Sequence, residues 1–166
     1  MSFFLAQCHS QTQWTQFGLI DDNNTNCGPA YISDTDPASW IGVVNNSEAK
    51  LLHYYAIDKC IRFYKPNTHL QLESTCDSAL IDGNTLYFIE LKERCSSGWL
   101  AKASDQILNT MRLYKANDPH ANQFQLVGQV CNSLKPKASS GHMNVIRKFH
   151  SQSGCKLIVQ KNIEIS

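Results

Sequence analysis

The segment between residues 77 and 92 constrains the fold more than any other part of the chain. Two strand-like runs, residues 77–81 and 86–92, flank the dipeptide Gly83-Asn84. A short Gly-Asn connection between such runs is typical of a β-hairpin. If these two residues form the loop, Asp82 pairs with Thr85, and the rest of the ladder follows outward. The sequence therefore predicts both a hairpin and its register.

The predicted register brings three charged side chains together. Asp77 faces Glu90, and directly opposed residues have Cβ atoms roughly 5 Å apart, close enough for two carboxylates to hold one divalent cation. Lys92 follows Glu90 at the spacing that places both side chains on one face of a strand. If Asp82-Gly83 formed the loop instead, the pairing register would change by two residues, and Asp77 would lie opposite Phe88, still on that face. Only an odd change of register, from a bulge or a three-residue loop, would separate the charges.

A structural ion pair on the surface would also explain these charges, and such pairs contribute little to stability. The strand that carries Glu90 argues against this explanation, because it reads Leu-Tyr-Phe-Ile-Glu-Leu-Lys and is apolar on both faces. Charged groups in a buried strand are costly unless they are paired or bind a metal. A second Glu-x-Lys triplet, at residues 48–50, lacks this setting because it opens a helical pattern.

These residues resemble the signature of the PD-(D/E)xK nuclease superfamily, which has the restriction-endonuclease-like fold. The resemblance rests on Asp77, Glu90 and Lys92, followed by a predicted helix that contains Gln106. One departure is Cys76, which stands where the signature names proline. The resemblance covers the order of elements from residue 47 to the C-terminus.

The resemblance implies a role for each matching residue. Asp77 and Glu90 would bind Mg²⁺, with Mn²⁺ as a substitute, helped by the backbone carbonyl of Leu91. Lys92 would orient or activate the attacking water, and Gln106 would complete the site. The chain would then be a Mg-dependent phosphodiester hydrolase of the endonuclease type, acting on DNA rather than RNA.

Residues 47–166 are predicted to form a nuclease-like α/β core, in the order α-β-β-β-α-β, with a mixed central sheet flanked by helices. Ser47 can cap a first helix whose apolar residues recur at helical spacing as far as Ile61. Glu48 lies in its first turn, where it either joins the metal site, as an acid does in some superfamily members, or favours the helix N-terminus. Strands are expected at 69–72, 77–81, 86–92, 124–131 and 156–160, with a short helix or turn at 145–150.

A second long helix is predicted after Ser97-Gly98. Its apolar stripe consists of Trp99, Ala103, Ile107, Met111 and Tyr114. Gln106 falls at the edge of this stripe, so its side chain can point toward the sheet. The sequence Asn-Asp-Pro at 117–119 is expected to end the helix.

Residues 1–46 are predicted to be a β-rich N-terminal extension that either packs on the core or binds a partner. Strand-like runs occur at 3–5, 14–20 and 40–44, separated by a turn-rich segment at 21–29. The extension contains four aspartates and no lysine or arginine. A protein partner or a second copy of the chain would fit such an acidic surface.

The C-terminal part is the basic region of a nearly neutral chain, whose net charge is +1. Residues 134–166 carry six basic side chains and one acidic side chain. Lys135, Lys137, Arg147 and Lys148 are therefore candidates for contacts with a phosphate backbone. The alternative is that these side chains only solvate the surface.

The cysteines and the hydropathy of the chain bear on its compartment. Seven cysteines occur without a Cys-x-x-Cys pair, and a reduced, cytoplasmic setting explains this odd number more simply than a disulfide framework. No apolar run approaches the length of about 20 residues that a membrane span needs. The N-terminal sequence lacks the basic residues of a secretory signal, so export is not expected.

Two other functions remain open from the sequence. The first is a nuclease-like fold used as a non-catalytic binding or assembly module, which would need no charges in a buried strand. The second is a thiol-based enzyme that uses Cys76 or Cys95. A nucleophilic cysteine needs an oriented histidine beside it, and the sequence does not show which histidine lies there. The histidines show no zinc-binding spacing.

Overall fold

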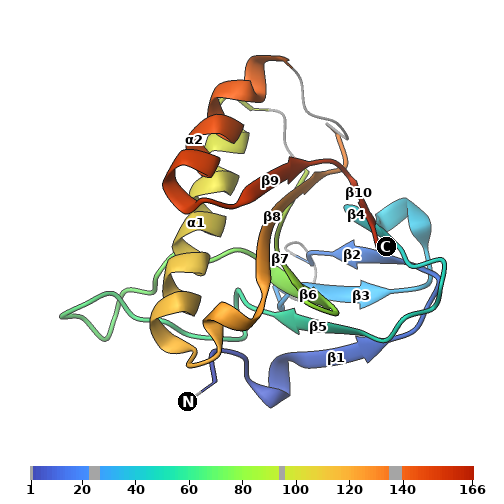
Figure 1. Cartoon of the computed structure of the whole chain (residues 1–166), viewed down its shortest axis with the longest axis horizontal. Coiled ribbons are helices and arrows are strands. Elements are labelled where there is room, and N and C mark those ends of the chain that lie inside the picture. Colours follow the sequence, from blue (N-terminus) through green and yellow to red (C-terminus); the bar gives the residue numbers. More distant parts are fainter. Residues whose placement is uncertain (1, 23–26, 94–95, 135–139) are drawn as a thin grey trace.

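The computed structural model describes residues 2–22, 27–93, 96–134 and 140–166. These residues form an α/β structure with two β-sheets and two α-helices in three layers (Figure 1). The helices cover one face of the larger sheet, and the smaller sheet lies against its other face.

The strands of the larger sheet, in spatial order, are β1 (His9–Thr12), β5 (Leu52–Ala56), β6 (Ser78–Asp82), β7 (Thr85–Lys92), β8 (Gln125–Asn132) and β9 (Lys156–Val159). Those of the smaller sheet are β10 (Asn162–Glu164), β4 (Gly42–Asn45), β2 (Gln16–Ile20) and β3 (Tyr31–Ser33). The helices are α1 (Trp99–Asn117) and α2 (Met143–Ser153), and 3-10 turns lie at Ala6–Cys8, Pro37–Ser39, Ala121–Gln123 and Ser140–His142. Pairing in the larger sheet is antiparallel from β1 to β7 and parallel from β7 to β9.

Strand β7 is buried on both faces, as the sequence predicts. Leu86 and Phe88 belong to the core between the sheet and the helices. Ile89 and Leu91 belong to the core between the two sheets. By alternation, Glu90 lies on the helix side of the strand. The carboxylate of Glu90 therefore enters the layer between the larger sheet and the helices, whose core is mainly apolar.

Helix α1 is confirmed over its predicted length. It begins directly after Gly98, which has a φ of +76°, and ends at Asn117 before Pro119. The side chains of the predicted stripe, Trp99, Ala103, Ile107, Met111 and Tyr114, are all buried. No helix in the described residues combines the length and the apolar character needed to cross a membrane.

The predicted helix at residues 47–61 is wrong. Residues 52–56 form β5, in which Leu52, Tyr54 and Ala56 are buried and alternate with half-buried residues. Aromatic residues favour strands, and these apolar positions fit a period of two as well as a helical one. The described residues before β6 therefore contain no α-helix, and the first element of the expected α-β-β-β-α-β order is absent from them.

The predicted strand at 69–72 is also wrong, because the segment forms only an isolated bridge between Leu72 and Tyr64. The later elements are confirmed, since β8, α2 and β9 lie where strands and a short helix are expected. Helix α2 is longer than the predicted 145–150. One further strand, β10, has no counterpart in the sequence-based prediction.

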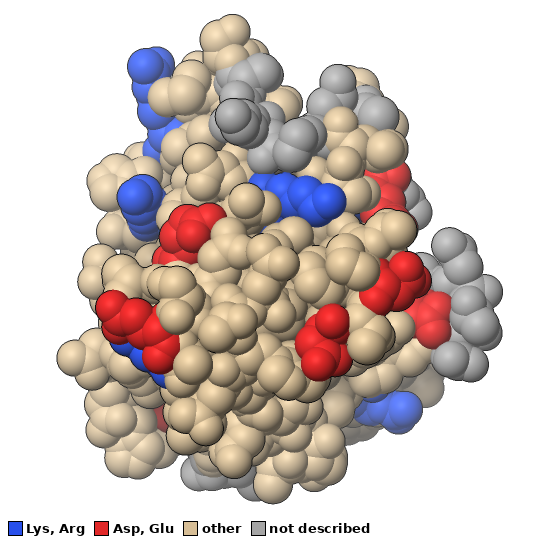
Figure 2. All heavy atoms as spheres, turned by 90° about the vertical axis from the view of Figure 1, so that its right-hand side faces the viewer, with Lys and Arg blue, Asp and Glu red and all other residues tan. Residues whose placement is uncertain are grey.

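Residues 1–46 are divided between the two sheets. They supply β1 at the edge of the larger sheet, and β2, β3 and β4 of the smaller one. Strand β4 pairs with β10 from the other end of the chain. The run at 3–5 is not a strand; instead Phe3 is buried against Phe63 and Tyr114. Figure 2 shows the side of the smaller sheet, where acidic side chains are scattered over a mainly uncharged surface with few basic ones.

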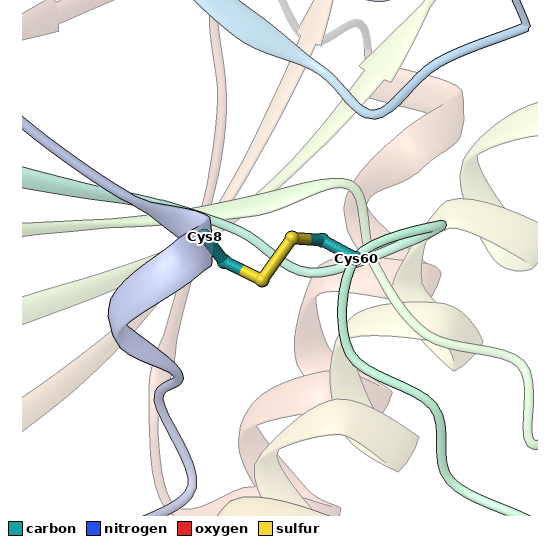
Figure 3. The surroundings of a disulfide bond; sticks show 2 residues. All are labelled: Cys8 and Cys60. Carbon is teal, nitrogen blue, oxygen red and sulfur yellow. A yellow bond between two sulfur atoms is a disulfide. The ribbon is translucent and has the colours of Figure 1, made fainter.

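A disulfide bond joins Cys8, just before β1, to Cys60 in the turn that follows β5 (Figure 3). The expectation that the cysteines are reduced is therefore wrong for this pair. The bond is possible because β1 and β5 are antiparallel neighbours, which the spacing of the cysteines does not reveal. The argument from reduced cysteines to a cytoplasmic location loses its basis.

Candidate functional site

The β6–β7 hairpin has the predicted register. A two-residue loop at 83–84 joins the strands, and its glycine has a φ of +53°. The ladder runs outward to Ser78 opposite Ile89. The next step places Asp77 opposite Glu90, at the end of the hairpin away from the loop. The geometric part of the prediction is thus confirmed.

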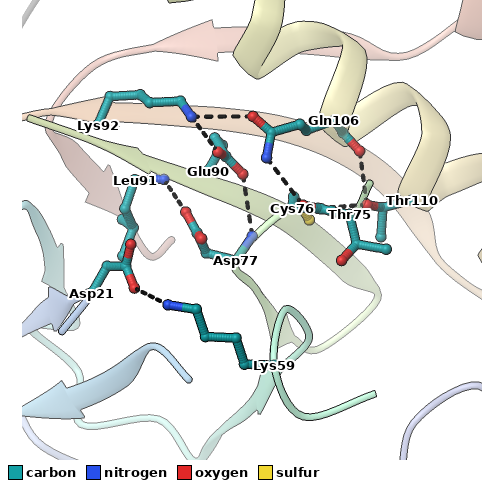
Figure 4. Close-up of polar contacts among 10 residues, drawn as sticks. All are labelled: Asp21, Lys59, Thr75, Cys76, Asp77, Glu90, Leu91, Lys92, Gln106 and Thr110. Atoms are coloured by element: carbon teal, nitrogen blue, oxygen red, sulfur yellow. Dashed lines mark hydrogen bonds and ion pairs between the residues drawn. The ribbon is translucent and has the colours of Figure 1, made fainter. Parts of the chain in front are cut away.

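Asp77 and Glu90 contact each other's strand directly (Figure 4). The backbone N–H of Asp77 donates a hydrogen bond to Oε2 of Glu90 at 3.2 Å. The backbone N–H of Leu91 donates to Oδ2 of Asp77 at 2.7 Å. These reciprocal bonds hold the two carboxylates side by side at the point where β6 begins.

Lys92 and Gln106 complete a chain of polar contacts (Figure 4). The Lys92 ammonium lies 2.6 Å from Oε1 of Glu90 and donates to Oε1 of Gln106 at 3.1 Å. The Gln106 amide then donates to the carbonyl oxygen of Thr75 at 3.2 Å. Through Gln106, helix α1 thereby contacts both Lys92 and the segment that leads to Asp77.

Burial raises the pKa of both carboxyl groups, because desolvation disfavours the ionised form. Asp77 is only 8% exposed and Glu90 only 2%. Desolvation, followed by the charge of Glu90, raises the pKa of Asp77 well above its usual range. Desolvation raises the pKa of Glu90 to about 7, although the Lys92 ammonium acts in the opposite direction. The ionised pair is therefore unfavourable in the metal-free protein.

We expect the metal-free protein to lose stability as the pH rises. A carboxyl group whose pKa is raised on folding keeps its proton in the folded state at pH values where the unfolded chain has lost it, so unfolding becomes easier with increasing pH. For Glu90 the window runs from its ordinary value of 4.5 to about 7, which corresponds to ~3 kcal/mol. Urea denaturation in the presence of a chelator, from pH 4.5 to 8, measures this slope. A Glu90→Gln variant should reduce this slope and leave the part that Asp77 contributes through its own raised pKa, and stability that increases across the window would contradict the expectation.

A cleft of about 340 Å³ opens over these residues and contains acids that the sequence analysis missed. Asp21 directly follows β2, and Asp58 lies in the turn after β5. The charge of Asp21 raises the pKa of Asp77, and that of Asp58 raises the pKa of Glu90. Each follows an apolar strand, which is the signal that could have identified them. Further lining side chains are Glu93 and Lys102.

The charges within this cleft are only partly balanced. The Asp21 carboxylate lies 3.9 Å from the ammonium of Lys59, and Glu90 is paired with Lys92. In the part of the chain that the structure describes, no basic side chain forms an ion pair with Asp77. A buried carboxylate without a counter-ion is costly.

The donor set in the cleft fits a hard divalent cation, because its charged oxygens come from carboxylates, the ligands that Mg²⁺ prefers. Asp77 and Glu90 would hold the ion, with Asp21 as the nearby third acid. Each carboxylate oxygen that accepts one hydrogen bond has a second lone pair for a metal. Among the described residues, no three histidine, cysteine or acidic side chains form a ready-made metal site.

Several predicted residues are not part of this cleft. Glu48 is exposed, pairs with Lys50 at 3.6 Å and lies on no helix, so its expected place on a first helix is wrong. Arg147 and Lys148 are exposed on α2 and do not line the cleft. Lys135 and Lys137 lie outside the described residues.

The thiol hypothesis receives no support from Cys76. This side chain is completely buried, and burial together with the charge of Glu90 raises the pKa of its thiol well above the usual value. A nucleophilic cysteine needs the opposite shift, because the thiolate is the reactive form. Cys95, the other candidate, lies outside the described residues.

Comparisons with known proteins give no independent guide to the site. No protein-family model, no curated protein and no solved structure matches the chain. The function is therefore argued from the geometry and chemistry of the cleft.

Proposed function

We propose that this protein is a divalent-metal-dependent nuclease that hydrolyses phosphodiester bonds, in DNA rather than RNA. The observation that carries the proposal is the buried carboxylate of Asp77, which lacks an ion-pair partner in the described residues and lies opposite Glu90. A cation between the two would offset the cost of ionising both groups. The adjoining Lys92 and Gln106 match the remaining positions of the nuclease signature.

Asp77 and Glu90 would hold Mg²⁺, or Mn²⁺ in its place, together with the backbone carbonyl of Leu91. When bound, the cation supplies Lewis-acid polarisation of the phosphate and lowers the pKa of a coordinated water. Asp21, whose side chain is 9% exposed, would add negative charge on the side of the smaller sheet. Because the ligands must be ionised, protons compete with the metal below about pH 7.

Lys92 would position the attacking water and offset the charge that develops on the phosphate. Its ammonium is already oriented, because it is held between Glu90 and the amide oxygen of Gln106. Gln106 in turn would fix the lysine and orient a neighbouring water or phosphate oxygen. Positioned donors of this kind are typically worth a factor of about 10²–10³ in rate.

The test is incubation of the wild type and a Lys92→Ala variant with single- and double-stranded DNA and RNA, with Mg²⁺, Mn²⁺ or a chelator. We expect metal-dependent cleavage of DNA by the wild type, and a loss of about 10²–10³-fold in the variant. Cleavage that persists in the chelator, or that is unchanged in Lys92→Ala, would refute the assignment.

The second candidate function is a non-catalytic binding or assembly module with a protein partner. Two observations favour it: the close Glu90–Lys92 ion pair of 2.6 Å, and the largely uncharged side of the smaller sheet in Figure 2, which suits a protein partner better than a phosphate backbone. A module of this kind would leave every nucleic acid intact at any Mg²⁺ concentration. The same incubation therefore separates the two functions.

A further inference from the structure

A projecting segment at residues 62–73, here called the arm, extends from the body of the molecule on the far left of Figure 1. Its two limbs are joined by backbone hydrogen bonds. The N–H of Lys65 donates to the carbonyl of Gln71 at 2.8 Å, and the N–H of Glu73 donates to that of Phe63 at 2.7 Å. A bridge between Tyr64 and Leu72 lies between these bonds. The arm is thus a loop whose two limbs are held together by one antiparallel bridge and the hydrogen bonds on either side of it.

The arm exposes three large apolar side chains. Leu70 is 93% exposed, Leu72 50% and Tyr64 45%. These three are among the large exposed apolar residues of the described chain, and they lie together on one small element. Clustered apolar exposure on a projecting element is typical of an interaction surface.

The charge of the arm is positive. Arg62, Lys65 and His69 are exposed, and Glu73 is the one acid of residues 62–73. Glu73 forms an ion pair with Arg112, whose guanidinium lies 3.2 Å from the Glu73 carboxylate. The arm therefore offers basic and apolar groups together, which is the composition that a polyanion with stacked bases attracts.

The arm is fastened to the same helix that organises the candidate site. On α1, Asn109 donates to the carbonyl of Ser74 at 2.8 Å and to the Glu73 carboxylate at 3.1 Å. One turn earlier, Gln106 bonds to Thr75. The chain then runs from the base of the arm through Thr75 directly into Asp77. In Figure 1 the arm projects on the opposite side of α1 from the smaller sheet.

We propose that the arm enters a groove of duplex DNA whose backbone is bound at the candidate site. This inference rests on the proposed nuclease function. The major groove of B-form DNA admits an element as wide as two paired chain segments, which is the width of the bridged limbs of the arm. The corresponding groove of an RNA duplex is too narrow and deep for side chains to read. Arg62 and Lys65 contact phosphates, and Leu70 contacts the bases at the tip.

The experiment measures binding of a 30-base-pair DNA duplex by fluorescence anisotropy, with Ca²⁺ in place of Mg²⁺ and over a range of salt concentrations. For the double variant Arg62→Ala/Lys65→Ala we expect an affinity about tenfold lower. The slope of log affinity against log salt concentration should also be shallower, by the equivalent of about two phosphate contacts. Leu70→Ser should weaken binding with little change in salt dependence. The matched control, Lys115→Ala/Lys156→Ala, removes the same charge from exposed positions on α1 and β9.

Hydrolysis of bis(4-nitrophenyl) phosphate, which is too small to reach the arm, should be the same in the arm variants and the wild type. Duplex binding that depends on the arm in a protein without hydrolytic activity would support the arm and refute the nuclease. The arm proposal is overturned if the wild type does not bind the duplex, or if the control loses as much affinity as the arm variant. It is also overturned if Leu70→Ser changes only the oligomeric state in sedimentation.

Discussion

Replacing Asp77 with asparagine should lower the rate of DNA cleavage by about 1000-fold or more while leaving the fold intact. The asparagine amide oxygen can still accept the hydrogen bond that the Leu91 N–H donates at 2.7 Å, so the variant removes the charge and keeps the contact. Because that charge is buried opposite Glu90, its loss should stabilise the metal-free protein at pH 8. Cleavage rates and urea denaturation measure the two effects separately.

Asp82→Asn is the matched control for this variant. Asp82 lies at the loop end of the same hairpin, opposite Thr85, and it is half-buried and does not line the cleft. The Asp82→Asn variant lacks an identical charge on the same pair of strands, so the cleavage rate of this variant should equal that of the wild type. If both variants cleave at the wild-type rate, Asp77 has no role in the reaction.

Reduction of the Cys8–Cys60 bond should have the largest effect on stability. The two cysteines are 52 residues apart, and closing a loop of this length removes ~4 kcal/mol of conformational entropy from the unfolded chain on the polymer model. For a chain of this size the loss corresponds to a fall of about 10 °C in the unfolding temperature. Denaturation in the presence and absence of a reductant measures it.

A Cys8→Ala/Cys60→Ala variant distinguishes this bond from the other cysteines. Its stability should resemble that of the reduced wild type, and the reductant should not change it further. Mass spectrometry of the unreduced wild type must show the bond. An oxidised protein that unfolds at the same urea concentration with and without reductant would contradict the expectation.

The hairpin and helix α1 could be predicted from the sequence because their signals are local. The loop at 83–84 fixes which residues pair, so the positions of Asp77 and Glu90 follow from a short stretch of chain. The stripe on α1 likewise involves only one helix face, and it placed Gln106 where its side chain can point toward the sheet. In the structure that side chain accepts a hydrogen bond from Lys92 of the sheet.

Strand β5 was missed because its apolar residues satisfy two periods at once. Leu51 contributed to the apparent helical spacing, yet it is 48% exposed. The burial of Leu52 and Tyr54 instead follows the alternation of a strand between two others. Pairing with β1 and β6 decides between the two periods, and the sequence of this segment alone does not reveal that pairing.

The acids on the far side of the cleft and the disulfide were missed for a related reason. Asp21 lines the same cleft as Asp77 only because β2 of the smaller sheet packs on the larger one. Cys60 reaches Cys8 only because β5 lies beside β1. With seven cysteines in the chain, no spacing rule selects this pair. Contacts between segments that are distant in the sequence can be predicted only when the topology is known.

Calorimetric titration of the wild type and Asp77→Asn with Mn²⁺ at pH 7.5 tests the central claim most directly. If Asp77 and Glu90 hold a divalent cation, the wild type should bind Mn²⁺ with a saturable signal and release protons as the carboxyl groups ionise, and Asp77→Asn should show neither. A wild type that gives no binding heat, or a variant that binds Mn²⁺ equally well, would contradict the account.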